Sequence, residues 1–129
     1  MNTARAYDTE RYRRLAIKKD LIELNQWMEA VEDINEDLAQ FKIIEHQLVQ
    51  NSSIASGILG FRRKNTLVMG LLCKYEQDLK KEYEYGKREY DLPRAKEHEK
   101  YRDYFNELTM EFKQLKKAIY SNLCKYKRR

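Results

Sequence analysis

The chain of 129 residues is 36% charged and 42% apolar, and it carries a formal net charge of +5. One proline and four glycines argue against a sheet protein with many tight turns and against low-complexity disorder. This length is sufficient for one domain whose hydrophobic core needs no metal or disulfide. We therefore expect residues 1–129 to form a single domain of long, charged helices.

The first predicted helix covers about 15–50. Its apolar residues recur with heptad spacing at two positions, and only a helix places such residues on one face. These residues are Ile17, Leu24, Val31 and Leu38 at the first position, and Trp27, Ile34, Phe41 and Leu48 at the second. Residues 1–14 carry no sustained stripe and are expected to be a frayed extension of this helix.

The second predicted helix follows a Ser- and Gly-rich break, NSSIASGILG, at residues 51–60. Gly57 and Gly60 are expected to turn the chain there, so that this helix begins between Ser53 and Thr66 and covers about 60–90. Its apolar stripe is less regular than that of the first helix, and it contains Val68, Leu72, Tyr75 and Leu79.

The third predicted helix has Pro93 in its first turn and covers about 93–127. Its heptad residues are His98, Phe105, Phe112, Ile119 and Tyr126, with Tyr101, Leu108 and Leu115 at the second position. The short connection before Pro93 makes the second and third helices antiparallel neighbours. The sequence thus predicts an all-α fold, an elongated antiparallel three-helix bundle with coiled-coil-like packing.

The two histidines are not expected to form a metal site. Pairing the helices as antiparallel hairpins places His98 level with residues near 26 and 85, whereas His46 lies roughly 30 Å away along the bundle axis. Neither histidine has a glutamate three positions before it, which is the spacing of carboxylate-bridged di-iron bundles. His98 is interpreted as a core or bundle-end histidine, and no metal, cofactor or catalytic residue is predicted.

The cysteines and the acidic residues also provide no catalytic group. The same helix pairing places Cys73 and Cys124 roughly 20 Å apart, beyond the reach of a disulfide, and neither has a histidine base beside it. A row of carboxylates on the first helix lies away from the core positions, so it is expected to be a solvated face partly paired with lysines. Its members are Glu29, Glu32, Asp33, Glu36 and Asp37.

Basic residues are expected to gather at one end of the bundle. Residues 51–75 and 113–129 contain four and seven lysines or arginines without any acidic residue, and helix pairing brings both segments to the same end. The stretch GILGFRRKN at residues 57–65 is not a phosphate-binding loop, because the Gly-Lys-Ser/Thr of a Walker motif and a preceding strand are missing. The candidate anion- or partner-binding residues are Arg62, Arg63, Lys64, Lys116, Lys117, Lys125, Lys127, Arg128 and Arg129.

Without a set of catalytic groups, the sequence predicts a non-enzymatic helical-bundle protein that acts through its surface as a scaffold, an adaptor or an assembly subunit. The alternative is a nucleic-acid-binding protein whose basic end makes non-specific phosphate contacts. No signal peptide or transmembrane segment is predicted, and a cytoplasmic location is expected. Self-association is expected through apolar residues off the core stripe, among them Ile22, Ile43, Ile44, Leu67 and Leu71.

Overall fold

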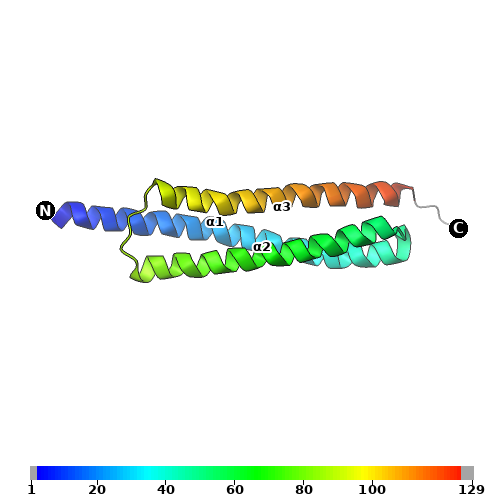
Figure 1. Ribbon diagram of the computed structural model, residues 1–129, viewed down its shortest axis with the longest axis horizontal. Helices are drawn as coiled ribbons and strands as arrows, with labels where there is room; N and C mark the ends of the chain where they lie inside the picture. The colour runs from blue at the N-terminus through cyan, green and yellow to red at the C-terminus, as the bar shows by residue number, and fades with distance from the viewer. Residues whose placement is uncertain (1–2, 126–129) are drawn as a thin grey trace.

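The computed structural model describes residues 3–125, and their side chains from residue 4 onward. Helix α1 covers Thr3–Ile44 and continues into a short π-helical segment, η1, at Glu45–Val49; α2 covers Ser52–Tyr85 and α3 covers Leu92–Cys124. The three helices lie side by side along one axis, with α2 antiparallel to the other two (Figure 1). The predicted three-helix bundle is confirmed, and no helix of the described residues has an apolar stretch long enough to cross a membrane.

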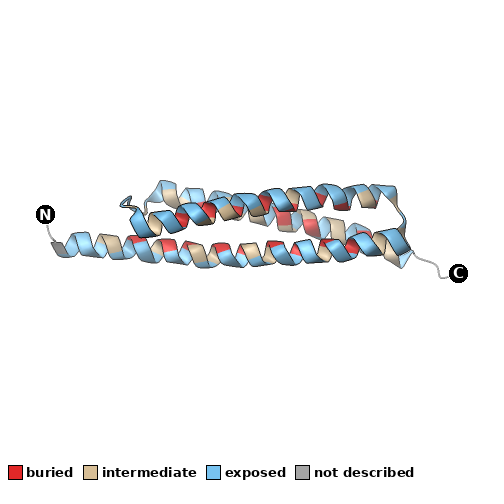
Figure 2. Ribbon diagram, turned by 90° about the horizontal axis from the view of Figure 1, so that it is seen from below, coloured by how far each residue is buried: buried red, intermediate tan, exposed pale blue. Residues whose placement is uncertain are grey.

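The buried residues of each helix follow heptad spacing and face the bundle axis (Figure 2). In α1 this stripe starts at the polar residue Arg13, one helical turn before Ile17, and it includes the polar residue Asp20. Apolar periodicity does not reveal such positions, and α1 begins at Thr3, well before the predicted start near residue 15. The buried stripe of α1 consists of Arg13, Ile17, Asp20, Leu24, Trp27, Val31, Ile34, Leu38 and Phe41.

Gln50 and Asn51 form the turn between the first two helices, at what we call the turn end of the bundle. Gln50 has a left-handed backbone conformation, with φ 49° and ψ 49°. The Asn51 side chain caps α2 by accepting hydrogen bonds from the backbone N–H groups two and three residues later. The prediction that Gly57 and Gly60 turn the chain is therefore wrong: both lie inside α2, which this cap starts at Ser52.

The π-helical segment changes which residues at the end of the first stripe face the core. A π-helical turn holds more residues than an α-helical turn, so every later residue is displaced around the helix axis. Leu48, which was predicted on the core face, is 40% exposed, whereas Val49 packs against the core. The prediction for Leu48 is wrong because the helix changes type before that residue.

Residues 86–91 connect α2 to α3 without helical structure, at what we call the connection end of the bundle. The Asp91 side chain caps α3 by accepting a hydrogen bond from the Arg94 N–H at 3.1 Å. Pro93 lies in the first turn of α3, as predicted. The N-terminal part of α1 extends beyond this connection (Figure 1).

The extended connection shifts α3 along α2, relative to the antiparallel pairing that placed His98 beside residue 85. His98 forms a hydrogen bond with Tyr75, so it is not level with residue 85. Its expected level on α1, near residue 26, agrees with the stacking of its ring on Trp27. The sequence pairing treated residues 86–91 as part of a tight hairpin, which explains an error on α2 of about two to three helical turns.

The core is apolar toward the turn end, where rings from all three helices meet. Phe112 of α3 stacks on Phe61 of α2 with 5.5 Å between ring centroids, and it packs against Phe41 of α1 at 6.2 Å. Asn65 of α2 interrupts this core near the middle of the bundle. Its amide donates to the Val31 carbonyl at 3.2 Å, while its buried Oδ1 accepts no hydrogen bond from any described residue.

Candidate functional site

A buried polar cluster surrounds His98 on α3, between the middle of the bundle and the connection end. The side chain of His98 is almost fully buried; its Nδ1 lies 2.6 Å from the Tyr75 hydroxyl, and its Nε2 lies 2.6 Å from Oε1 of Glu23. An ionised carboxylate only accepts hydrogen bonds, so these partners assign the proton to Nε2. With the proton on Nε2 alone, the Tyr75 hydroxyl donates to Nδ1, and both ring nitrogens are satisfied.

Glu23 of α1 is also bound by Arg102 of α3. The Arg102 guanidinium donates to Oε1 at 2.7 Å and to Oε2 at 3.2 Å. These hydrogen bonds from Arg102, reinforced by the contact with His98, hold the pKa of Glu23 below its usual range. Glu23 is therefore an ionised carboxylate that joins α1 to two residues of α3.

Asp20, one helical turn before Glu23, completes the cluster. Its Oδ1 lies 3.5 Å from Nε2 of His98, and its other oxygen accepts a hydrogen bond from the Tyr90 hydroxyl. Burial raises the pKa of Asp20, since desolvation disfavours its charged form more than these partners favour it. Burial also raises the pKa values of Tyr75 and Tyr90, so both hydroxyls remain protonated donors.

Aromatic rings hold the cluster in place. Trp27 stacks on the His98 ring with 5.0 Å between centroids, and Tyr101 stacks on Tyr75 at 4.0 Å. On the outside, a surface hollow of about 570 Å³ between α1 and α3 is lined by residues that include Asp20, Glu23, Tyr90, His98 and Arg102. The arrangement is a pre-oriented imidazole facing two carboxylates next to solvent.

The sequence analysis did not predict this cluster, although it correctly placed His98 beside residue 26 of α1, next to Trp27. The search for metal ligands looked for glutamate within the same helix, whereas Asp20 and Glu23 come from a different helix. A signal was present, because Asp20 occupies the heptad position that Trp27 and Ile34 occupy later in α1. A carboxylate at a core position requires a buried partner, and His98 is the residue at the matching level.

The candidate basic residues of α2 lie near the turn end but point in different directions. Lys64 forms an ion pair with Glu111 of α3 at 2.5 Å. Arg62 lines a small hollow that also includes Lys42 of α1, and Arg63 is exposed. Consecutive residues are about 100° apart around an α-helix, so these three side chains do not converge on one phosphate.

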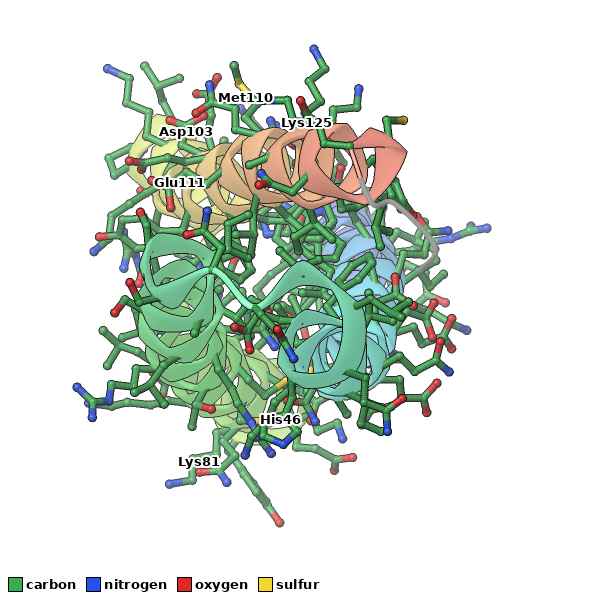
Figure 3. All side chains as sticks on the ribbon, turned by 90° about the vertical axis from the view of Figure 1, so that its right-hand side faces the viewer. His46, Lys81, Asp103, Met110, Glu111 and Lys125 are labelled. Carbon is green, nitrogen blue, oxygen red and sulfur yellow. The ribbon has the colours of Figure 1, made fainter. Side chains whose placement is uncertain are left out.

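The candidate basic residues of α3 lie toward the same end. Lys116 places its Nζ over the Phe112 ring at 5.4 Å, and Lys117 is exposed. Figure 3 looks at the turn end and shows Lys125 directly after α3, with Glu111 directed toward α2. The remaining candidates, Lys127, Arg128 and Arg129, lie outside the described residues.

The other predicted surface groups take varied positions. In the acidic row of α1, Asp37 is half-buried and the other four carboxylates are exposed, and no ion pair links the row to a lysine within residues 4–125. Cys73 is half-buried, Cys124 is exposed, and both are free thiols. Of the apolar residues expected off the core stripe, Ile44 is half-buried against the core, whereas exposed ones are Ile22, Ile43, Leu67 and Leu71.

A comparison of the chain with known protein families, curated proteins and solved structures found no match.

Proposed function

We propose that this protein is a non-enzymatic, cytoplasmic helical-bundle protein that acts through its surface as an interaction or assembly subunit. The observation that carries the proposal is the outer face of α2, where Leu67 and Leu71 are 65% and 38% exposed. Large apolar side chains one helical turn apart favour contact with another protein surface. The free thiols of Cys73 and Cys124 fit a reducing compartment.

A second copy of the chain is the occupant that this face fits best. Gly70 lies on the same side of α2 as the two leucines, and a Cβ placed there would meet no atom within 4 Å. A small residue lets a second backbone approach closely and leaves room for a large side chain. If two α2 helices pair antiparallel about an axis between Gly70 and Leu71, the Leu71 side chain of each copy lies over Gly70 of the other.

The charges flanking the face favour the same arrangement. Arg63 and Asp78 are exposed and lie equally far on either side of the axis between Gly70 and Leu71. Antiparallel pairing places Arg63 of one copy beside Asp78 of the other, twice in the symmetric dimer. Such rim pairs fix orientation more than they add affinity.

The variant Gly70→Leu tests this interface. In the monomer the substitution meets open space and replaces a poor helix former, so it stabilises the helix by about 0.8 kcal/mol. In the dimer it fills the space that Leu71 of the second copy needs. We expect wild type to dimerise at micromolar concentrations in sedimentation velocity, and Gly70→Leu to be a well-folded monomer.

Gly60→Leu is the matched control, because a Cβ at Gly60 also meets no atom within 4 Å, and Gly60 lies about 15 Å along the helix from the dimer axis, beyond Arg63. This variant should dimerise like wild type. A wild-type chain that stays monomeric, or equal dimerisation of both variants, contradicts the proposed interface.

Binding of nucleic acid at the turn end is the second candidate function, favoured by the exposed bases Arg62 and Lys117 on neighbouring helices. The double variant Arg62→Glu with Lys117→Glu should then abolish salt-dependent binding to duplex DNA, because phosphate contacts depend on these charges. Arg5→Glu with Arg11→Glu, at the opposite end, is the control with the same change in net charge. Equal losses in both double variants would show bulk attraction without a site.

A further inference from the structure

Three side chains of the His98 cluster combine the donor atoms of a metal site. Asp20, Glu23 and His98 each offer one ligand atom, and these atoms lie within 4.8 Å of one another. Imidazole nitrogen and carboxylate oxygen bind Zn²⁺ and neighbouring first-row divalent ions at about 2.0–2.2 Å. We propose that these three residues form a divalent-metal site of the Zn²⁺ class that ties α1 to α3.

The two separations from the His98 nitrogen lie near those of a tetrahedral site, and no ligand atom is more than 4.8 Å from another. Adjacent ligands of a tetrahedral metal lie about 3.4 Å apart, which follows from bond lengths near 2.1 Å. Nε2 of His98 is already 3.5 Å from Oδ1 of Asp20 and is 2.6 Å from Oε1 of Glu23. The Glu23 carboxylate therefore moves outward by less than about 1 Å to admit the ion.

When the ion binds to Nε2 of His98, the proton of that nitrogen can be carried by Nδ1 instead. Metal at Nε2 requires the neutral tautomer that carries its proton on Nδ1. The Tyr75 hydroxyl, 2.6 Å from Nδ1, then accepts a hydrogen bond where it donated one before. An imidazole with a single proton keeps that proton in this exchange, so metal binding changes only the tautomer.

Each ligand is held by an additional residue, as the ligands of protein metal sites usually are. Tyr75 fixes the imidazole through Nδ1, and Arg102 contacts both oxygens of Glu23. Tyr90 donates to the oxygen of Asp20 that faces away from His98. These contacts fix the orientation of all three side chains before the ion arrives, which lowers the entropy cost of binding.

The cluster is both enclosed and accessible. Asp20 and His98 are 8% and 2% exposed, so few waters compete for their ligand atoms. The hollow of about 570 Å³ outside the cluster provides an entry path and room for the water that completes the coordination. The two carboxylates balance the charge of a dication, and Arg102 adds one positive charge beside it.

The experiment is a titration of the metal-free full-length protein with Co²⁺, which gives visible absorption bands in low-coordinate sites, followed by displacement with Zn²⁺. We expect saturation at one ion per chain with micromolar affinity and a melting temperature that rises by several degrees with Zn²⁺. Glu23→Gln and Asp20→Asn should each weaken binding by roughly tenfold or more. Both substitutions retain side-chain size, and circular dichroism checks that helicity is unchanged.

His46→Gln is the matched control, because His46 is the second histidine of the chain and is exposed in η1. This variant should bind Co²⁺ and Zn²⁺ as wild type does. The absence of saturable binding at one ion per chain overturns the proposal. It is also overturned if folded Glu23→Gln and Asp20→Asn bind as tightly as wild type, or if His46→Gln loses the ion.

Discussion

The two halves of the bundle use the same heptad spacing with different chemistry. Near the turn end the buried positions hold apolar side chains such as Leu38 and Phe112, whereas near the connection end they include Arg13, Asp20 and His98. Apolar positions stabilise the fold through surface removed from water, and imperfect packing lowers that contribution gradually. Buried polar positions stabilise it only when every donor and acceptor has a partner.

Arg13 illustrates how a buried side chain of the polar half is paired, although Oε1 of Glu82 and Nη2 of Arg94 in the same half are buried without a hydrogen-bond partner among the described residues. Its side chain is 2% exposed, and its guanidinium donates to the carbonyl of Glu82 at 2.6 Å and to both carboxylate oxygens of Glu10. The Glu82 carbonyl lies in the last turn of α2 and also accepts a hydrogen bond from the Gly86 N–H at 3.0 Å. A polar residue at a core position thus adds a second hydrogen bond at the end of a neighbouring helix and joins α1 to α2 there.

The largest effect is expected in the apolar half. Leu38 is fully buried, so Leu38→Ala should lower the free energy of unfolding by about 3 kcal/mol, through lost burial and a residual cavity. Ile43→Ala on the same helix removes a similar side chain that is 57% exposed, and it should change stability by less than about 0.5 kcal/mol. Guanidinium unfolding measures both, and a smaller loss for Leu38→Ala than for Tyr75→Phe would reverse the comparison.

Tyr75→Phe tests the polar half. Removing one hydroxyl leaves Nδ1 of buried His98 without its donor, which should cost about 1–2 kcal/mol although the ring stays in place. Tyr85→Phe removes the hydroxyl of a tyrosine that is 82% exposed and should be neutral. Similar unfolding curves for the two variants would show that the His98 cluster does not depend on complete hydrogen bonding.

Asn65 tests an unpaired polar group within the apolar half. Its Oδ1 is buried and accepts no hydrogen bond from the described residues, so Asn65→Leu should raise stability by up to about 1 kcal/mol. The Val31 carbonyl loses only the additional bond from the amide. Thermal unfolding measures the change, and a lower melting temperature would show that this bond outweighs the unsatisfied oxygen.

The smallest effect concerns Glu10, which is half-buried near the connection end. Hydrogen bonds from Arg13, and then from Arg14, lower its pKa from 4.5 to about 2. The folded-state pKa is below the unfolded one, so these contacts stabilise the protein above pH 4.5, and that contribution is lost as the pH falls toward 2. The stability difference between wild type and Glu10→Gln should shrink to zero over this range in acid-unfolding measurements; a constant difference would contradict it.

The sequence by itself determined the number of helices, their antiparallel order and most of the buried stripe. Heptad spacing is a local property, because residues three and four apart share a helix face whatever the helix packs against. Pro93 likewise acts within one turn, and the start of α3 was predicted to within one residue. The turn at Gln50 and Asn51 was not predicted, because the sequence pattern favours Gly57 and Gly60 as the turn residues. The Asn51 side chain instead caps α2, and the two glycines are accommodated inside the helix.

Only the tertiary structure decided the candidate site. Its three ligand atoms come from α1 and α3, and their meeting depends on how far α3 is displaced by residues 86–91. It also decided that Lys64 pairs with Glu111 while Arg62 and Arg63 point elsewhere. Periodicity fixes the face on which a residue lies, but the partner it meets there depends on the axial offset between helices, which is set by loop conformation and packing together.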